Sequence, residues 1–175
     1  MPKIKITSAQ GLTQLTGTTN ISLVDDIISG VKADVTNITA DTALTAADSG
    51  KTFVFNDTDG ATITLPDSGA GDITGVSFEF ALGVSTTSSA HKVVCADTTN
   101  ERLHGSLLIV DTDTSDAVSA SAALAADNFS AISSNGSTTG IVGSRYKLTN
   151  IGVDKWLIEG MILGNGAVAT PLAVS

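Results

Sequence analysis

From residue 44 onward, hydrophobic and polar side chains alternate in short runs that are interrupted by turn residues. Residues 51–56 and 61–65 have the alternation and composition of strands, and the Asp/Thr/Gly stretch between them, residues 57–60, is typical of a hairpin turn. Pro66 ends the second run because proline donates no ladder hydrogen bond. Residues 76–82 have a large hydrophobic residue at every second position, which places these side chains on one face of a strand. Each run predicts a strand with one buried face.

The same pattern continues to the last hairpin. Strands are predicted at residues 91–96, 105–110 and 129–133, and a hairpin is predicted from residues 145–150 and 155–160 around Gly152-Val153-Asp154. The stretch 111–126 is polar and rich in alanine, and the tail 164–175 is small and apolar without periodicity. No repeat of the kind found in solenoids or propellers is apparent. The chain is therefore expected to be all-β, with a β-sandwich or jelly-roll-like domain.

Residues 1–43 differ from the rest of the chain. Residues 3–7 alternate as a short strand does, and the apolar positions between residues 23 and 31 have near-helical spacing, with Asp25 and Asp26 on the other face. The segment has too few large apolar residues to fold alone. We expect an extended N-terminal arm over residues 1–43 that packs on a neighbouring subunit, and a β-sandwich domain over residues 44–175.

Composition and charge narrow the function classes. The chain has 42% hydrophobic but only 4% aromatic residues, and Ser and Thr make up about a quarter of it, which favours strands and turns. Its net charge of -9 opposes binding to nucleic acid and to anionic membranes. A single cysteine, Cys95, excludes an internal disulfide. No run has the character of a signal peptide or a membrane span, so synthesis in a cytoplasm is expected.

Few residues are candidates for catalysis. Only two histidines occur, and His104 lies close to Glu101, a pairing that acid–base chemistry can use. No nucleophile motif accompanies them, so a surface histidine beside a turn is the preferred interpretation. Cys95 stands among small apolar neighbours, which indicates a buried strand cysteine; a reactive thiolate is the alternative, with His91 or Lys92 as the nearby cation.

Two loops are candidates for ligand binding. Residues 111–116 resemble the first half of a calcium loop, but Asp116 stands where an EF-hand has Gly, and Ala122 stands where it has Glu. A solvated acidic loop is preferred, and calcium binding by Asp111, Asp113 and Asp116 remains the open alternative. Residues 50–52 spell the Gly-Lys-Thr of a phosphate loop, but Thr45 replaces its leading glycine and no strand–loop–helix setting exists.

Trp156 is the only tryptophan, and two roles are open to it. Its place in an alternating strand favours a core anchor, and an exposed binding hot spot is the alternative. No catalytic, cofactor-binding or metal-ligating residues are assigned, and no cofactor is expected. The chain is interpreted as a binding protein rather than an enzyme.

A family resemblance covers residues 44–175 at the level of pattern. It is carried by residues 44–53 (LTAADSGKTF), 61–66 (ATITLP), 75–82, 154–160 (DKWLIEG) and a small tail with Gly164-Asn165-Gly166 and Thr170-Pro171. This order of elements resembles a β-module of tailed-bacteriophage virion proteins. Such modules occur on capsid surfaces as decoration or cement proteins, often as trimers, and in head and tail fibres.

The resemblance implies a structural role. The short length favours a capsid decoration protein that binds the major capsid protein on the outer surface of the head, as a homotrimer, and ties capsomers together against internal DNA pressure by strand addition and apolar packing. Its location is then the virion. The alternative is a fibre or receptor-binding tip. A small hydrolase is the third possibility, and the scarcity of histidine counts against it.

Overall fold

The computed structural model of the chain describes residues 33–113, 118–124 and 127–175. The strand expected at residues 3–7 and the helix expected between residues 23 and 31 lie outside these ranges. The described residues belong to one compact unit that begins at Ala33.

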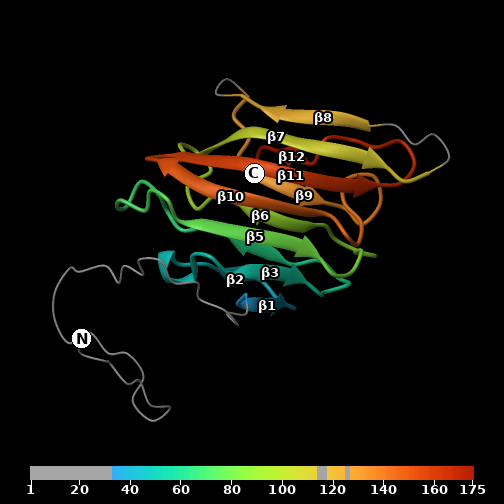
Figure 1. The fold of residues 1–175 in the computed structure, drawn as a ribbon, viewed down its shortest axis with the longest axis horizontal. Coiled ribbons are helices and arrows are strands. Elements are labelled where there is room, and N and C mark those ends of the chain that lie inside the picture. The colour runs from blue at the N-terminus through green and yellow to red at the C-terminus, as the bar shows by residue number, and fades with distance from the viewer. Residues whose placement is uncertain (1–32, 114–117, 125–126) are drawn as a thin grey trace, which may run out of the picture. The chain divides into compact units, whose positions relative to one another are not determined.

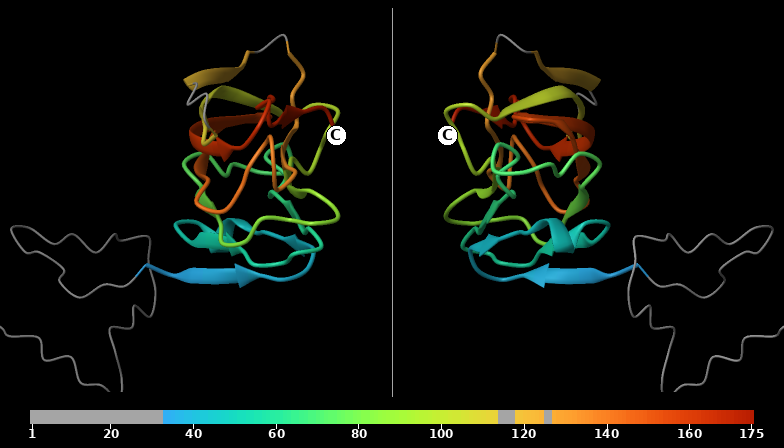
Figure 2. Two further views of the ribbon diagram at one scale, coloured as in Figure 1. Left: turned by 90° about the vertical axis from the view of Figure 1, so that its right-hand side faces the viewer. Right: turned by 90° about the vertical axis from the view of Figure 1, so that its left-hand side faces the viewer.

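Two β-sheets form this unit, and they face each other across one core (Figure 1, Figure 2). The seven-stranded sheet has the order β1 (Val35–Ile38), β3 (Thr52–Phe55), β5 (Ser77–Leu82), β10 (Arg145–Gly152), β11 (Lys155–Gly164), β7 (Arg102–Asp111) and β8 (Val118–Ala123). The five-stranded sheet has the order β12 (Leu172–Ala173), β9 (Ala131–Ser134), β6 (His91–Val94), β4 (Thr62–Thr64) and β2 (Thr42–Ala43). The expected all-β, sandwich-like fold is confirmed.

The first seven strands alternate between the two sheets. Within the seven-stranded sheet β1, β3 and β5 pair in parallel, and within the other sheet β2, β4 and β6 do the same. The chain therefore winds as a coil around the core, which distinguishes this part from an antiparallel jelly roll. Residues 57–60 form a turn between β3 and β4, but those strands lie in different sheets, so the predicted hairpin at this point is wrong.

The predicted hairpin at the end of the chain is confirmed. Strands β10 and β11 pair antiparallel from Arg145 opposite Met161 to Gly152 opposite Lys155, and together they lie between β5 and β7. Strand β11 then pairs in parallel with β7 over its whole length. This insertion makes the seven-stranded sheet mixed, and the five-stranded sheet is mixed because β9 pairs antiparallel with β6 and β12.

The domain begins earlier than Leu44, where the sequence pattern placed its start. Strands β1 and β2, assigned to the arm, pair with β3 and β4. Both strands are short, and Ile38 is the only buried residue in them, so little hydrophobic alternation marks them in the sequence. Two further strands were not predicted, β8 within the Ala-rich stretch and β12 within the tail.

The single helical turn of the described chain, η1 (Ala46–Asp48), leads into β3. The Asp48 carboxylate accepts hydrogen bonds from the Thr45 backbone at 3.0 Å and from Lys51 Nζ at 2.8 Å. The hydrogen bond from Lys51, followed by those from Thr45, lowers the pKa of Asp48 to about 2. This turn fixes the entry to the strand.

The core is built on an aromatic cluster. Phe53 stacks on Phe80, and Phe80 stacks on Tyr146 with ring centroids 5.4 Å apart. Trp156 is fully buried beside Phe78, with centroids 6.0 Å apart. These side chains come from the inward positions of β3, β5, β10 and β11, as their alternation predicted.

Candidate functional site

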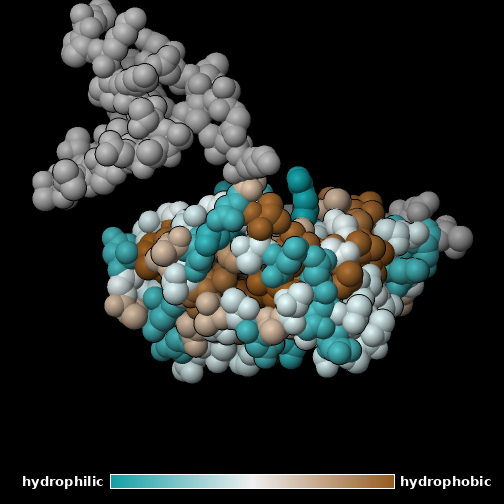
Figure 3. Space-filling model, turned by 90° about the horizontal axis from the view of Figure 1, so that it is seen from below, coloured by the Kyte–Doolittle hydropathy of each residue, from teal (hydrophilic) through white to brown (hydrophobic). Residues whose placement is uncertain are grey.

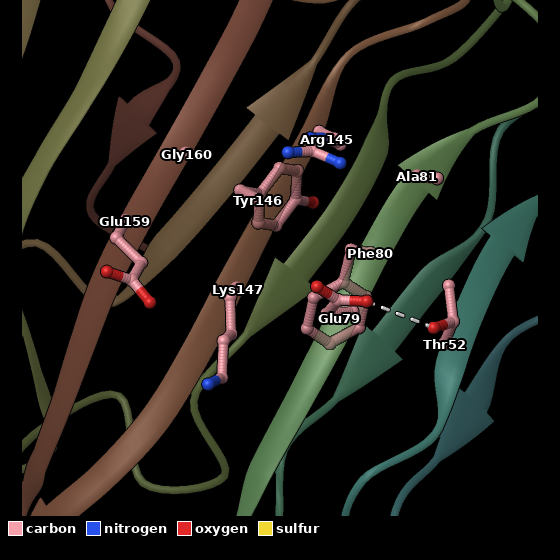
Figure 4. Close-up of a pocket in the computed structure, with 9 residues that line it drawn as sticks. All are labelled: Thr52, Glu79, Phe80, Ala81, Arg145, Tyr146, Lys147, Glu159 and Gly160. Atoms are coloured by element: carbon pink, nitrogen blue, oxygen red, sulfur yellow. Dashed lines mark hydrogen bonds between the residues drawn. The ribbon is translucent and has the colours of Figure 1, made fainter. Parts of the chain in front are cut away.

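A shallow groove runs across the outer face of the seven-stranded sheet, the face turned away from the core (Figure 4). Its volume is about 410 Å³. It crosses four neighbouring strands and is lined by Thr52 on β3, Glu79, Phe80 and Ala81 on β5, Arg145, Tyr146 and Lys147 on β10, and Glu159 and Gly160 on β11.

Strand register brings the polar lining into one row. Thr52 is opposite Glu79, Glu79 is opposite Lys147, and Lys147 is opposite Glu159. Directly opposite residues share a face and have neighbouring Cβ atoms. The Thr52 hydroxyl donates to Glu79 Oε2 at 3.2 Å, and Figure 4 shows Lys147 between the two carboxylates. The row alternates hydroxyl, anion, cation and anion.

The floor of the groove depends on Gly160. A Cβ at this position would lie 2.5 Å from Tyr146 Cα and 2.6 Å from the Arg145 carbonyl oxygen. The backbone φ of +151° is also one that side-chain-bearing residues rarely adopt. Glycine therefore allows β10 and β11 to approach closely beneath the charged row.

The outer face is more cationic than the rest of an acidic protein. Of the six Lys and Arg residues in the described ranges, four occupy outward positions on this sheet, namely Arg102, Arg145, Lys147 and Lys155. Glu79 and Glu159 are the carboxylates on its outward strand positions. Within the described chain, ion pairs are confined to Lys51, which contacts Asp48 at 2.8 Å and Asp34 at 3.8 Å. The Arg102 guanidinium donates to the carbonyl oxygens of Thr98, Thr99 and Glu101 and to Asn128 Oδ1, whereas no salt bridge within the described chain involves the other three cations of this face.

Apolar side chains share this face. Leu108 and Leu157 are 44% and 38% exposed on β7 and β11, and Val118 on the edge strand β8 is 63% exposed. Leu108 has Met161 directly opposite it on β11 and Ala120 directly opposite it on β8. Charged and apolar groups thus lie side by side on this face, as they do on many surfaces that contact other proteins.

The structure does not bring Glu101 and His104 together. Glu101 is fully buried, where Oε1 accepts from the Ser68 backbone at 2.8 Å and Oε2 accepts from the Asp97 backbone at 2.9 Å. His104 lies within β7 on the outward, half-exposed side rather than beside a turn. Their side chains point to opposite faces, so they form no acid–base pair.

Cys95 and Trp156 lie in the core, which confirms the prediction of a buried strand cysteine and of a core anchor. Burial raises the pKa of the Cys95 thiol to about 12, and the nearby Glu101 charge adds to this, so a thiolate is strongly disfavoured. Trp156 is fully buried and donates through Nε1 to Glu101 at 3.2 Å. The exposed hot-spot alternative for Trp156 is wrong.

His91 is also buried. Its Nδ1 accepts a hydrogen bond from the Ala61 backbone at 3.2 Å, and its ring lies 4.6 Å from that of Phe55. Burial lowers the pKa of His91, and the Val84 backbone and the Asp57 charge oppose this only in part. A neutral imidazole of this kind cannot serve as the cation beside Cys95.

The half-matched calcium loop is described only in part. Asp111 is buried at the end of β7, the Asp113 backbone donates to its Oδ1 at 3.1 Å, and Asp116 lies outside the described residues. Within the described ranges no cluster of three or more His, Cys, Asp or Glu side chains is placed to hold a metal ion. Residues 50–52, which spell the phosphate-loop triplet, lead into strand β3, and Lys51 is paired with acidic side chains. A strand follows them where a phosphate loop has a helix.

Comparisons of the chain with protein-family models, with curated protein sequences and with solved structures found no match. In the part of the chain that the structure describes, no helix has the length and apolar character needed to span a bilayer. The groove and the charged face around it are consequently the main guide to function.

No motif in the sequence groups the residues that line the groove. Glu79, Lys147 and Glu159 are the polar members of three alternating runs, and that alternation correctly predicts that they face outward. Their convergence depends on the insertion of β10 and β11 beside β5, a pairing that no local pattern reports.

Proposed function

We propose that this protein is a structural component of a tailed-phage virion, a decoration protein that binds the outer surface of the capsid. The resemblance of residues 44–175 to virion β-modules motivates this proposal. The observation that supports it most is the open outer face of the seven-stranded sheet, where four of the six described cations lie around exposed apolar side chains.

On this proposal, the protein acts by binding to the shell and reinforcing it mechanically, and it catalyses no reaction. Arg145 and Lys147 meet acidic side chains of the major capsid protein, and Leu108 and Leu157 pack against apolar groups beside them. Opposite charges across the contact steer association and fix its register, and the apolar contacts slow dissociation. A trimer presenting three such faces multiplies the strength of weak individual contacts.

The fibre or adhesive-tip alternative rests on the polar groove itself, which has room for a small polar ligand. One observation weighs against it. The large exposed hydrophobic side chains of the described chain are aliphatic, and the aromatic side chains pack in or against the core. Sugar-binding surfaces commonly use exposed aromatic rings as apolar platforms with a polar tip.

Co-sedimentation with undecorated phage heads, together with the mass from light scattering, tests the proposal. Saturable binding of an oligomer at a fixed number of copies per head is the expected result. An oligomer that ignores heads and binds host cells would replace the decoration function with the adhesive one.

A further inference from the structure

Asn165 differs from the other asparagines that the structure describes in the bonding of its side-chain amide. The described ranges contain seven asparagines, and six of them use the amide group in a hydrogen bond, namely Asn37, Asn56, Asn100, Asn128, Asn135 and Asn150. Asn165 is exposed, and within the described ranges its side chain neither donates nor accepts a hydrogen bond. Its amide can therefore rotate about the side-chain bonds.

Exposure to water does not by itself leave an amide unpaired. Asn37 lies on β1, the edge strand on the side of the molecule seen in Figure 3, where polar and hydrophobic side chains are mixed. Its exposed side chain accepts a hydrogen bond from Asn56 Nδ2 at 2.7 Å. The unpaired amide of Asn165 is thus a feature of its own loop, which connects β11 to β12.

Glycine follows Asn165 in the chain. Because glycine has no Cβ, its backbone nitrogen can approach the preceding side chain without a steric clash. One other described asparagine, Asn135, is also followed by glycine and is exposed as well. The two loops are neighbours, since the Asn165 N–H donates to the Ser137 carbonyl oxygen at 3.0 Å. Asn135 is therefore an internal control with the same dipeptide.

Hydrogen bonds hold the side chain of Asn135 in place. Its Nδ2 donates to Thr138 Oγ1 at 2.9 Å. Its Oδ1 accepts from the backbone N–H of Ser137 at 2.9 Å and from that of Thr139 at 3.0 Å. A reaction at this amide carbon must first break these bonds, which raises its barrier.

The two following glycines differ in the same sense. Gly136 and Gly166 have similar backbone φ values, +75° and +80°. A Cβ at Gly136 would lie 2.2 Å from the Thr86 carbonyl oxygen, whereas a Cβ at Gly166 would meet no atom within 4 Å. Gly136 is thus packed against another loop, and Gly166 has open space in which its nitrogen can turn toward the preceding side chain.

We propose that Asn165 is a site of spontaneous deamidation. The Gly166 backbone nitrogen gives up its proton to a base in solution and attacks Asn165 Cγ. A new N–C bond forms, the Cγ–Nδ2 bond breaks, and the side-chain nitrogen takes up a proton and leaves as ammonia. Water then opens the resulting five-membered succinimide ring at either carbonyl carbon, which yields aspartate or isoaspartate. The net reaction consumes water and releases ammonia, and nothing is oxidised or reduced.

The products alter the connection between the two sheets. Either product adds a negative charge to a chain whose net charge is already -9. Isoaspartate also routes the backbone through the side-chain carbon, which lengthens the connection between β11 in one sheet and β12 in the other. The reaction needs no partner protein, so it is independent of the decoration function.

Mass spectrometry of the full-length chain, sampled during incubation in mildly alkaline buffer, follows both sites separately. Trypsin releases Asn165 within residues 156–175 and Asn135 within residues 103–145, because neither stretch has an internal Lys or Arg. The peptide 156–175 is expected to gain the mass of an amide-to-acid change and to resolve into an aspartate and an isoaspartate form. Fragment ions distinguish Asn135 from Asn128, and Asn135 is expected to react at least about tenfold more slowly than Asn165, a difference of about 1.4 kcal/mol in barrier.

Unfolding and two variants supply the controls. In guanidinium chloride, where the folded contacts are lost, the two sites are expected to react at similar rates. Asn165→Gln is expected to abolish the change in peptide 156–175, because glutamine must close a larger ring. Thr138→Val removes the acceptor for Asn135 Nδ2 and is expected to speed the reaction at Asn135 alone. Equal rates at Asn135 and Asn165 in the folded protein, or persistence of the Asn165 amide there, would overturn the proposal.

Discussion

The indole Nε1 of Trp156 donates a hydrogen bond to Glu101 Oε1 at 3.2 Å inside the core. The same carboxylate accepts from the Ser68 backbone and hydroxyl and from the Asp97 backbone. One buried side chain thus holds the start of β7, the start of β11 and the loop that follows β4. Removing the carboxylate would leave all of these donors without their acceptor at once.

Replacing Glu101 is therefore expected to destabilise the domain strongly. Glu101→Ala leaves several buried donors unpaired, and a loss of about 3 kcal/mol or more in the free energy of unfolding is expected. Glu101→Gln keeps one acceptor oxygen and is expected to lose less. Urea denaturation followed by the fluorescence of Trp156 measures both. Equal stabilities for wild type and Glu101→Ala would contradict the described network.

Stability is expected to depend on pH through His91. Burial lowers the pKa of His91 in the folded protein below its ordinary value of 6.5. The unfolded chain therefore takes up a proton first as the pH falls below about 6.5, and the free energy of unfolding falls by at most about 1.4 kcal/mol per pH unit toward the folded pKa. Above that range this group contributes no pH dependence.

The variant His91→Asn isolates this effect, since its Oδ1 can replace Nδ1 as acceptor for the Ala61 N–H. The difference in urea midpoint between pH 7.5 and 5.5 is expected to shrink in His91→Asn. It should remain in His104→Asn, which changes the half-exposed histidine. An unchanged difference in both variants would assign the pH dependence to the carboxylates.

Gly160 and Gly152 form a matched pair for the close approach of β10 and β11. Both have positive φ, +151° and +145°, but a Cβ at Gly152 would meet open space. Gly152→Ala is expected to cost about 1 kcal/mol from backbone strain alone. Gly160→Ala is expected to cost about 3 kcal/mol, because its Cβ also collides with β10. Similar thermal midpoints for the two variants would show that the groove floor tolerates a side chain.

Cys95 is expected to be inert in the folded protein. Its thiol is buried and its pKa is raised to about 12, so the thiolate that reacts with disulfide reagents is scarce. Ellman's reagent should label it at the rate of unfolding in buffer and at once in concentrated urea. Rapid labelling in buffer would place the thiol at the surface.

The alternating runs were sufficient to predict most strands. Phe53, Phe78 and Trp156 each mark a run whose inward positions form the core, and the final hairpin follows from its turn. Strand β8 escaped prediction because its side chains are Val, Ser and Ala, which give little hydrophobic contrast at an edge. Burial there is too slight to impose a pattern.

The alternation of hydrophobic and polar residues along the sequence does not specify which strands pair. Successive turns of the coil place Val35 opposite Thr52 and Thr52 opposite Glu79, which are 17 and 27 residues apart, so most of the winding has no fixed period. The row of Thr52, Glu79, Lys147 and Glu159 depends on these registers and on the inserted hairpin. The candidate site is therefore a consequence of topology, and only its outward orientation was encoded locally.

The most direct test of the account compares two charge reversals in binding to undecorated phage heads. Arg145→Glu with Lys147→Glu reverses the groove cations, and Lys92→Glu reverses an exposed cation on the outward side of the five-stranded sheet. Saturable binding is predicted for the wild type and for Lys92→Glu, with affinity at least about tenfold weaker for the groove variant. Equal binding by all three proteins, or binding by none, would contradict the claim that this face attaches the protein to a capsid.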